Sequence, residues 1–216
     1  LDVILIKQAP SLALGNAKKE LLHLGSYAMR SFELAYDYIV NNTEKSADKG
    51  HKTEEAINKI DEDLTRYLID LSSEPLSQKE SEVLTNILDS SRDLERIGDH
   101  GEALINLTEY IRRKKVEFSP AALQELDLIY NMTLSFIKES LKSVEDNDIE
   151  LANSLVAKHE AIDKMERRLR KTHIHRLNRG ECSTQAGVNF IDIISHYTRV
   201  ADHAMNLAEK VQAEQI

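Results

Sequence analysis

Apolar residues recur every three or four positions along almost the whole chain, and this spacing predicts amphipathic helices throughout. Stretches rich in polar residues, Gly or Pro interrupt the pattern and mark where one helix ends and the next begins. Before the first helix comes a short apolar lead-in, residues 1–11. Six helices are predicted, at residues 12–40, 53–71, 77–112, 119–145, 149–178 and 183–211.

Several of these boundaries carry specific signals for helix ends. The segment Ser77-Gln78-Lys79-Glu80 is a capping-box signature, which predicts that a helix starts there. Ser119 before Pro120 combines an N-cap residue with proline at the first helical position, and Ser183 is a further N-cap. Gly180 is suited to end the fifth helix, because glycine readily adopts the left-handed conformation.

The chain also repeats itself. Residues 93–100, with the sequence DLERIGDH, are echoed 103 positions later by residues 196–203, with the sequence HYTRVADH. Residues 55–61 match 160–166 in a similar way. A repeat of roughly 105 residues is far longer than the 20–50 residues of solenoid repeats, so it indicates duplication of a three-helix unit. We therefore predict an all-α fold of two tandem antiparallel three-helix bundles, residues 12–115 and 116–216, preceded by the lead-in.

The third predicted helix has an apolar seam with a period near 3.5 residues, which is typical of helices packed side by side. Gly98 and Gly101 lie near this seam. Because glycine inside a helix costs about 1 kcal/mol relative to alanine, we expect another helix to approach closely there.

Composition and charge limit the classes of function that fit this chain. A formal net charge of -9 argues against general nucleic-acid binding, which requires a basic surface. The single Cys182 has no internal disulfide partner, so a reducing compartment is expected. There is no apolar run long enough to span a bilayer and no signal peptide. The chain begins with Leu1, which fits a segment of a longer protein, although tag removal or processing would give the same result.

Acidic residues suggest a metal site. The seam places Glu95 and Asp99 away from the core, four residues apart on one ridge, where their mutual repulsion would be relieved by a hard cation. Matching polar positions on the second and fifth helices face the same way, but in the second half Thr198 stands where Glu95 stands in the first. The alternative is a solvated acidic stripe, which the spacing alone favours. The candidate ligands are Glu55, Asn58, Glu95, Asp99, Glu160, Asp163 and Asp202, with Asp61 as a further neighbour.

One basic cluster stands out in this acidic chain, at the end of the fifth predicted helix. One explanation is that cations are favourable near a helix C-terminus. The other is a docking surface for anionic lipid, phosphate or an acidic partner. The cluster comprises Arg167, Arg168, Arg170, Lys171, His173, His175, Arg176 and Arg179.

Residues 93–100 closely resemble the signature of the PhoU family of phosphate-regulatory proteins. Residues 20–25 and 160–163 and the echo at 196–203 support the resemblance by their order and spacing. Residues 1–21 are similar to the entry into the PhoU-like region at the C-terminus of bacterial sodium/phosphate cotransporter-type membrane proteins.

The resemblance implies a non-catalytic regulatory domain that modulates phosphate transport at the cytoplasmic side of the inner membrane. The expected partner is a sodium/phosphate symporter in the same polypeptide, or a signalling protein; a homodimer is also compatible, and nucleic acid is not expected. Family members bind iron or other metals through Glu/Asp-x-x-x-Asp motifs on their outer surface. Glu95 and Asp99 match that motif in full, whereas in the second half only Asp202 matches.

Two other functions remain open at this level. A free-standing PhoU-type adaptor would negatively regulate phosphate uptake and a sensor kinase. A carboxylate-bridged metalloenzyme would need ligands in a buried bundle core, whereas these carboxylates are expected to face outward. Reading the gene upstream of Leu1 discriminates between the tethered domain and the free-standing adaptor.

Overall fold

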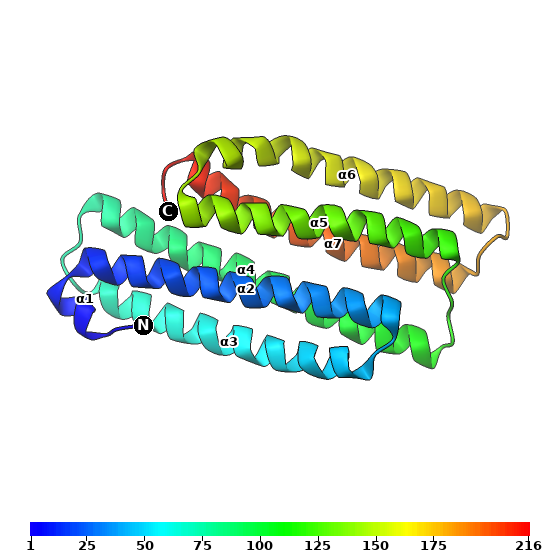
Figure 1. The fold of residues 1–216 in the computed structure, drawn as a ribbon, viewed down its shortest axis with the longest axis horizontal. Coiled ribbons are helices and arrows are strands. Elements are labelled where there is room, and N and C mark those ends of the chain that lie inside the picture. Colours follow the sequence, from blue (N-terminus) through cyan, green and yellow to red (C-terminus); the bar gives the residue numbers. More distant parts are fainter.

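The computed structural model describes residues 1–216, and all of its regular structure is helical (Figure 1). The all-α prediction is confirmed. Six long helices correspond to the six predicted from the sequence, and a seventh, short helix lies inside the lead-in. The helices are α1 (Ile4–Gln8), α2 (Pro10–Asn41), α3 (Glu44–Ser72), α4 (Gln78–Arg113), α5 (Pro120–Asp146), α6 (Ile149–Asn178) and α7 (Thr184–Gln212).

The start of α3 differs most from the prediction. We expected the polar residues 41–50 to be a break, yet α3 begins at Glu44. Asn42 and Thr43 make the reversal, and Asn42 has φ of 59° in the left-handed region that asparagine tolerates better than most residues. The first turns of α3 are held by packing of small side chains: Ala47 is buried, and Gly50 lies against Ile105 of α4. Because these first turns of α3 have few large apolar side chains, the periodicity of the sequence did not indicate this contact.

The predicted helix-end signals are confirmed. The Glu80 backbone N–H donates to Ser77 Oγ over 3.3 Å, and the Ser77 N–H donates to the Glu80 carboxylate over 2.8 Å, which completes the capping box. Ser119 and Ser183 accept from backbone N–H groups of α5 and α7 in the same way. Gly180 has φ of +69° and follows Arg179, the C-cap of α6.

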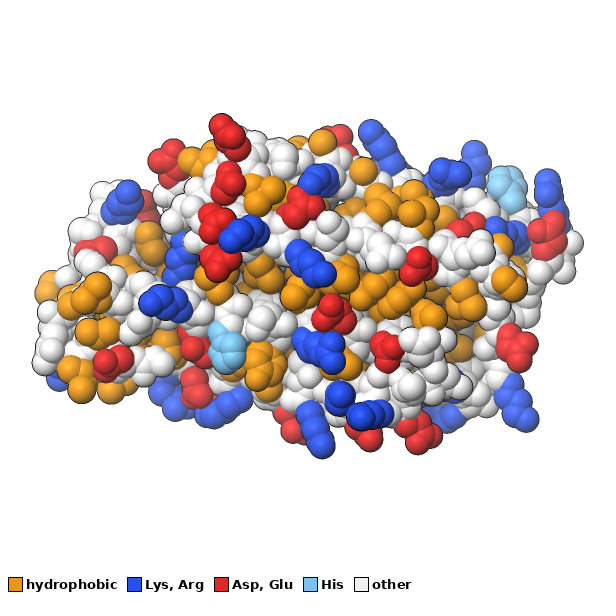
Figure 2. Space-filling view, in the orientation of Figure 1, with side chains coloured by type: hydrophobic (Ala, Val, Ile, Leu, Met, Phe, Trp, Pro, Cys, Tyr) orange, Lys and Arg blue, Asp and Glu red, His pale blue; other side chains and the backbone are white.

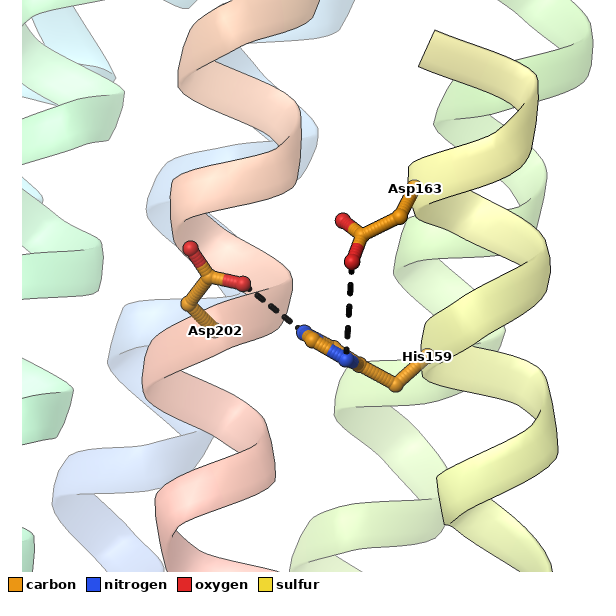
Figure 3. A group of neighbouring side chains, drawn as sticks. All are labelled: His159, Asp163 and Asp202. Carbon is orange, nitrogen blue, oxygen red and sulfur yellow. Dashed lines mark hydrogen bonds and ion pairs between the residues drawn. The ribbon is translucent and has the colours of Figure 1, made fainter. Parts of the chain in front are cut away.

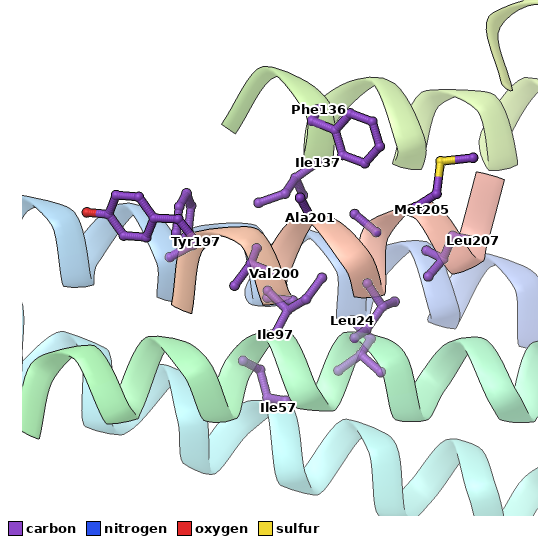
Figure 4. Close-up of a cluster of buried hydrophobic side chains, with 14 of the residues drawn as sticks. Leu24, Ile57, Ile97, Phe136, Ile137, Tyr197, Val200, Ala201, Met205 and Leu207 are labelled. Carbon is purple, nitrogen blue, oxygen red and sulfur yellow. The ribbon is translucent and has the colours of Figure 1, made fainter. Parts of the chain in front are cut away.

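The long helices run alongside one another in two layers (Figure 1). Helices α2, α3 and α4 pack against one another, and so do α5, α6 and α7. The layers meet where α4 contacts α7 and where α2 contacts α5. One cluster of 45 buried apolar residues extends through both layers, so they share a continuous core. Figure 4 shows part of it, with Ile97 of α4 directed toward Val200 of α7.

The predicted seam of the third helix is buried along α4, and its glycines mark close approaches as expected. A Cβ on Gly98 would lie 2.8 Å from Ile57 Cδ1 of α3. One on Gly101 would collide with Ser31 of α2. The buried seam residues are Ile87, Ser90, Leu94, Ile97, Gly101, Leu104, Thr108 and Ile111. None of the helices combines the length and the apolar character needed to cross a membrane.

Candidate metal centre and the α4–α7 seam

The signature stretch and its echo lie against each other in the structure. His100 Nδ1 of α4 and His196 Nδ1 of α7 are 2.9 Å apart, so one imidazole donates a hydrogen bond to the other. Asp93 Oδ1 accepts from His203 Nδ1 and from Asn206 Nδ2, each over 2.9 Å. Sequence comparison had identified the two stretches as copies and gave no indication that they are contact partners.

The histidine pair of this seam is neutral at neutral pH. Burial, together with the neighbouring His196 and His203, lowers the pKa of His100 to about 4. Burial also lowers the pKa of His196, with Arg199 as the next cause. Two neutral rings can share one proton as donor and acceptor, whereas two imidazolium ions at this distance would repel. The pair therefore joins α4 and α7 as an ordinary hydrogen bond.

Glu95 and Asp99 lie on the flank of α4, partly accessible to solvent, with side chains 26% and 37% exposed. Burial raises the pKa of Glu95, and the nearby Asp99 adds to the rise. Arg96, between them in sequence, reaches Glu95 over 3.8 Å and Asp99 over 3.2 Å. One exposed guanidinium thus partly balances two carboxylates, and the pKa of Glu95 remains raised despite it.

Helix α3 brings two further carboxylates to this ridge. Burial raises the pKa of Glu54, and the carboxylates of Glu102 and Asp99 raise it as well. Asp61 contributes to the raised pKa of Glu95 and accepts a hydrogen bond from Ser91.

Glu54 was not among the predicted ligands. A signal was available, because Glu54 and Asp61 are seven residues apart, each three positions before a buried seam residue of α3. Of the predicted α3 residues, Asn58 donates to Glu54, whereas Glu55 is exposed and forms no hydrogen bond or ion pair with α4.

The second half gathers a tighter group from α6 and α7 (Figure 3). His159 Nε2 lies 2.7 Å from Asp202 Oδ1, and His159 Nδ1 lies 3.9 Å from Asp163 Oδ2. One ligand atom of each residue lies within 4.8 Å of the other two. Asp163 and Asp202 were predicted, but His159 was missed; its spacing of four from Asp163 on α6 was the available signal. Glu160 is exposed and forms no hydrogen bond or ion pair with this group.

The donor set of this trio suits a transition metal. Imidazole nitrogen together with carboxylate oxygen is the ligand chemistry of iron, zinc and manganese sites. His159 is 22% exposed and Asp202 57%, so a cation could reach the group from solvent. Without a metal, His159 and Asp202 can satisfy each other through the hydrogen bond that they form here. The first ridge offers carboxylate oxygens only, which suits harder cations.

Comparison with known proteins places the chain in a family. The model of the PhoU domain matches residues 21–108 and 126–211. The chain is 32% identical over 133 residues to "Phosphate-specific transport system accessory protein PhoU homolog 1" of Thermotoga maritima, a match that covers 62% of this chain and 56% of that protein. It is 26% identical over 170 residues to "Putative inorganic phosphate export protein YjbB" of Escherichia coli, covering 78% of this chain and 31% of that protein.

Solved structures share the fold. PhoU from Pseudomonas aeruginosa superposes with a TM-score of 0.85 at 19% identity, covering 93% of this chain and 96% of that one. The phosphate transport system regulatory protein PhoU from Streptococcus pneumoniae gives 0.84 at 21% identity, covering 96% and 99%. The family match spans both halves of the molecule, and the chain belongs to the PhoU family.

Proposed function

We propose that this chain is a non-catalytic accessory regulator of phosphate transport, acting as a PhoU-type adaptor on the cytoplasmic side of the membrane. The observation that carries the proposal is the match of the PhoU domain to both halves of the chain. The names of its relatives point the same way, since one is a phosphate-specific transport accessory protein and another a phosphate export protein. In this function the chain would restrain a phosphate-importing transporter and its sensor kinase.

The fold suits an adaptor. We propose that residues 12–115 and 116–216 act as two tandem three-helix bundles, locked together along α4 and α7 by Asp93 and the histidine pair. His100 and His196, the two histidines of this seam whose pKa is lowered, hydrogen-bond to each other between helices, which fits a structural use. A rigid block of this kind presents long helical faces to a partner.

The similarity to the phosphate export protein supports a second candidate. That match covers 78% of this chain but 31% of the relative, as expected if a domain of this kind regulates phosphate transport from within a longer protein. The sodium/phosphate symporter tether expected from residues 1–21 is one version of this candidate, and the relatives support the adaptor better. The reading frame upstream of Leu1 distinguishes the two, because transport segments in that frame would favour the tethered domain.

Phosphate uptake tests the regulatory function. Removing the coding segment from its host should raise uptake of labelled phosphate severalfold when phosphate is plentiful, and returning the wild-type segment should restore the low rate. If uptake is the same with and without the segment at both high and low phosphate, the proposal fails.

We also propose that metal binds at both acidic groups. Glu95 and Asp99, with Glu54 and Asp61 beside them, would hold a cation on the α3–α4 ridge. The raised pKa values of Glu54 and Glu95 fit this assignment, because burial and then the neighbouring carboxylates disfavour the charged form of each group, a cost that a bound cation would relieve. In the second half, the trio of His159, Asp163 and Asp202 would bind iron or another divalent metal. When bound, the metal would supply charge neutralisation and cross-linking of neighbouring helices.

Elemental analysis tests both sites after equal loading with ferrous iron or manganese. The Glu95→Ala/Asp99→Ala and His159→Ala/Asp202→Ala variants should each retain less metal than the wild type. A control with two exposed carboxylates removed elsewhere on α4, Glu82→Ala/Asp89→Ala, should retain the full content. Equal metal in the wild type and both site variants would rule out the sites.

A further inference from the structure

The C-terminal half of α6 concentrates positive charge, and only part of it is paired within the bundle. Residues 164–179 contain seven Lys and Arg residues and a single carboxylate, Glu166, whereas residues 145–163 contain six carboxylates and one Lys. Figure 2 shows the Lys and Arg side chains projecting over this end of the molecule, at the upper right. A cationic surface of this density is unexpected on a chain with a net charge of -9.

Internal contacts account for only part of the cluster. Arg170 pairs with Glu166 and donates to Ser195 of α7, and Arg176 donates to Glu125 of α5. These arginines hold α6 against its neighbours. Lys164, Arg167, Arg168 and Lys171 are exposed and have no carboxylate partner and no side-chain hydrogen bond.

The helix dipole does not explain the four unpaired cations. Its influence is limited to the last turn, and α6 ends at Asn178. Lys171 therefore lies about two turns, and Lys164 about four turns, before the end of the helix. The spacing of Lys164, Arg167 and Lys171 places them on one face, and Ile174, 44% exposed, continues it.

This face is free and convex. Helix α6 packs only against α5 and α7, so its remaining side is directed away from the bundle (Figure 1). By contrast, a hollow of about 530 Å³ lined by Arg30, Tyr36 and Lys49 lies on α2, α3 and α5. A row of long, flexible cations along about 10 Å of exposed helix matches an extended anionic surface better than a single small anion.

We propose that the outer face of α6, formed by Lys164, Arg167, Arg168, Lys171 and Ile174, docks on a membrane surface rich in anionic lipid. The ammonium and guanidinium groups would lie at the lipid phosphates, and Ile174 would insert between headgroups. Binding of this kind is electrostatic and weakens with salt, because exposed charges are screened beyond about 10 Å at 0.1 M ionic strength. The docking surface does not depend on the phosphate-regulatory role and would orient the bundle whatever it regulates.

Sedimentation of the full chain with lipid vesicles tests the proposal. The wild type should bind vesicles containing about one third phosphatidylglycerol at low salt, and binding to pure phosphatidylcholine should be far weaker. The Arg167→Gln/Arg168→Gln/Lys171→Gln variant should lose about 100-fold in vesicle affinity, about fivefold for each cation near the surface. Ile174→Ser should weaken binding further and also reduce the part that survives high salt.

A charge-matched control separates a local surface from a net-charge effect. Lys19→Gln/Lys52→Gln/Lys138→Gln removes three other exposed cations without carboxylate partners, and circular dichroism checks that both triple variants fold. Equal loss of binding in the two triple variants would overturn the proposal, and so would equal binding to anionic and neutral vesicles. Binding to soluble polyglutamate with none to anionic vesicles would instead identify an acidic protein as the partner and would also overturn it.

Discussion

Asp93 is expected to be the residue whose loss most weakens the seam between the two layers. Its Oδ1 accepts hydrogen bonds from His203 and Asn206 of α7, and Lys210 Nζ lies 3.7 Å from Oδ2. The Asp93 and Lys210 side chains are each only 15% exposed, so water replaces these contacts poorly. Asp93→Ala would leave three polar groups of α7 without their partner.

The expected loss in the free energy of unfolding follows from the number of these contacts and from their exposure to solvent. A hydrogen bond to a charged group contributes about 1.5–3 kcal/mol, and two are lost. His203 is 26% exposed and Asn206 is exposed, so both can regain part of this from water, and we expect a loss of about 3 kcal/mol in the free energy of unfolding. For a chain of 216 residues this corresponds to a decrease of about 7 °C in Tm. Asp93→Asn keeps an acceptor and should lose about half as much.

Urea unfolding followed by circular dichroism measures the effect. Asp89→Ala is the matched control: it lies one turn earlier on α4, its side chain is 51% exposed, and its ion pair with Arg92 spans 3.9 Å. The control should change the free energy of unfolding by less than about 0.5 kcal/mol. If Asp93→Ala is no more destabilising than Asp89→Ala, the seam does not stabilise the fold as argued.

Three other predictions concern packing, pH and capping. Gly101→Val should lower the free energy of unfolding by about 2–3 kcal/mol, because the valine side chain would collide with Ser31. Gly15 has open space around it, so Gly15→Ala should raise the free energy of unfolding by about 1 kcal/mol. Thermal unfolding measures both, and the reverse order of stability would contradict the packing. Burial lowers the pKa of His173 below its usual 6.5. The contribution of neutral His173 to the free energy of unfolding is therefore complete above pH 6.5. Below that pH the unfolded chain takes up the proton first, so stability falls as the pH drops. Urea titrations at pH 7 and pH 5 should show a smaller decrease for His173→Gln than for the wild type, and an identical decrease would remove His173 as the cause. Ser77→Ala removes the N-cap of α4 and should cost about 1 kcal/mol, and unchanged urea unfolding would show that the cap is dispensable.

The sequence alone determined the features that depend on a single helix. Periodicity located six long helices and the buried face of α4, and cap residues located the starts of α4, α5 and α7. Periodicity could not reveal α1, because one buried residue in a five-residue helix makes no pattern. It also missed the first turns of α3, which are held by small side chains.

The tertiary structure decided which helices contact each other and how far each is shifted along its axis relative to its neighbours. The repeat identified 93–100 and 196–203 as copies, but the contact of His100 with His196 depends on how α4 and α7 are rotated and shifted along their axes. The grouping of His159 with Asp202 and of Glu54 with the α4 carboxylates depends on the same variables. Periodicity records the direction in which a side chain leaves its own helix. It contains no information on which residues of a neighbouring helix lie opposite that side chain, because the packing of all the helices together sets those neighbours.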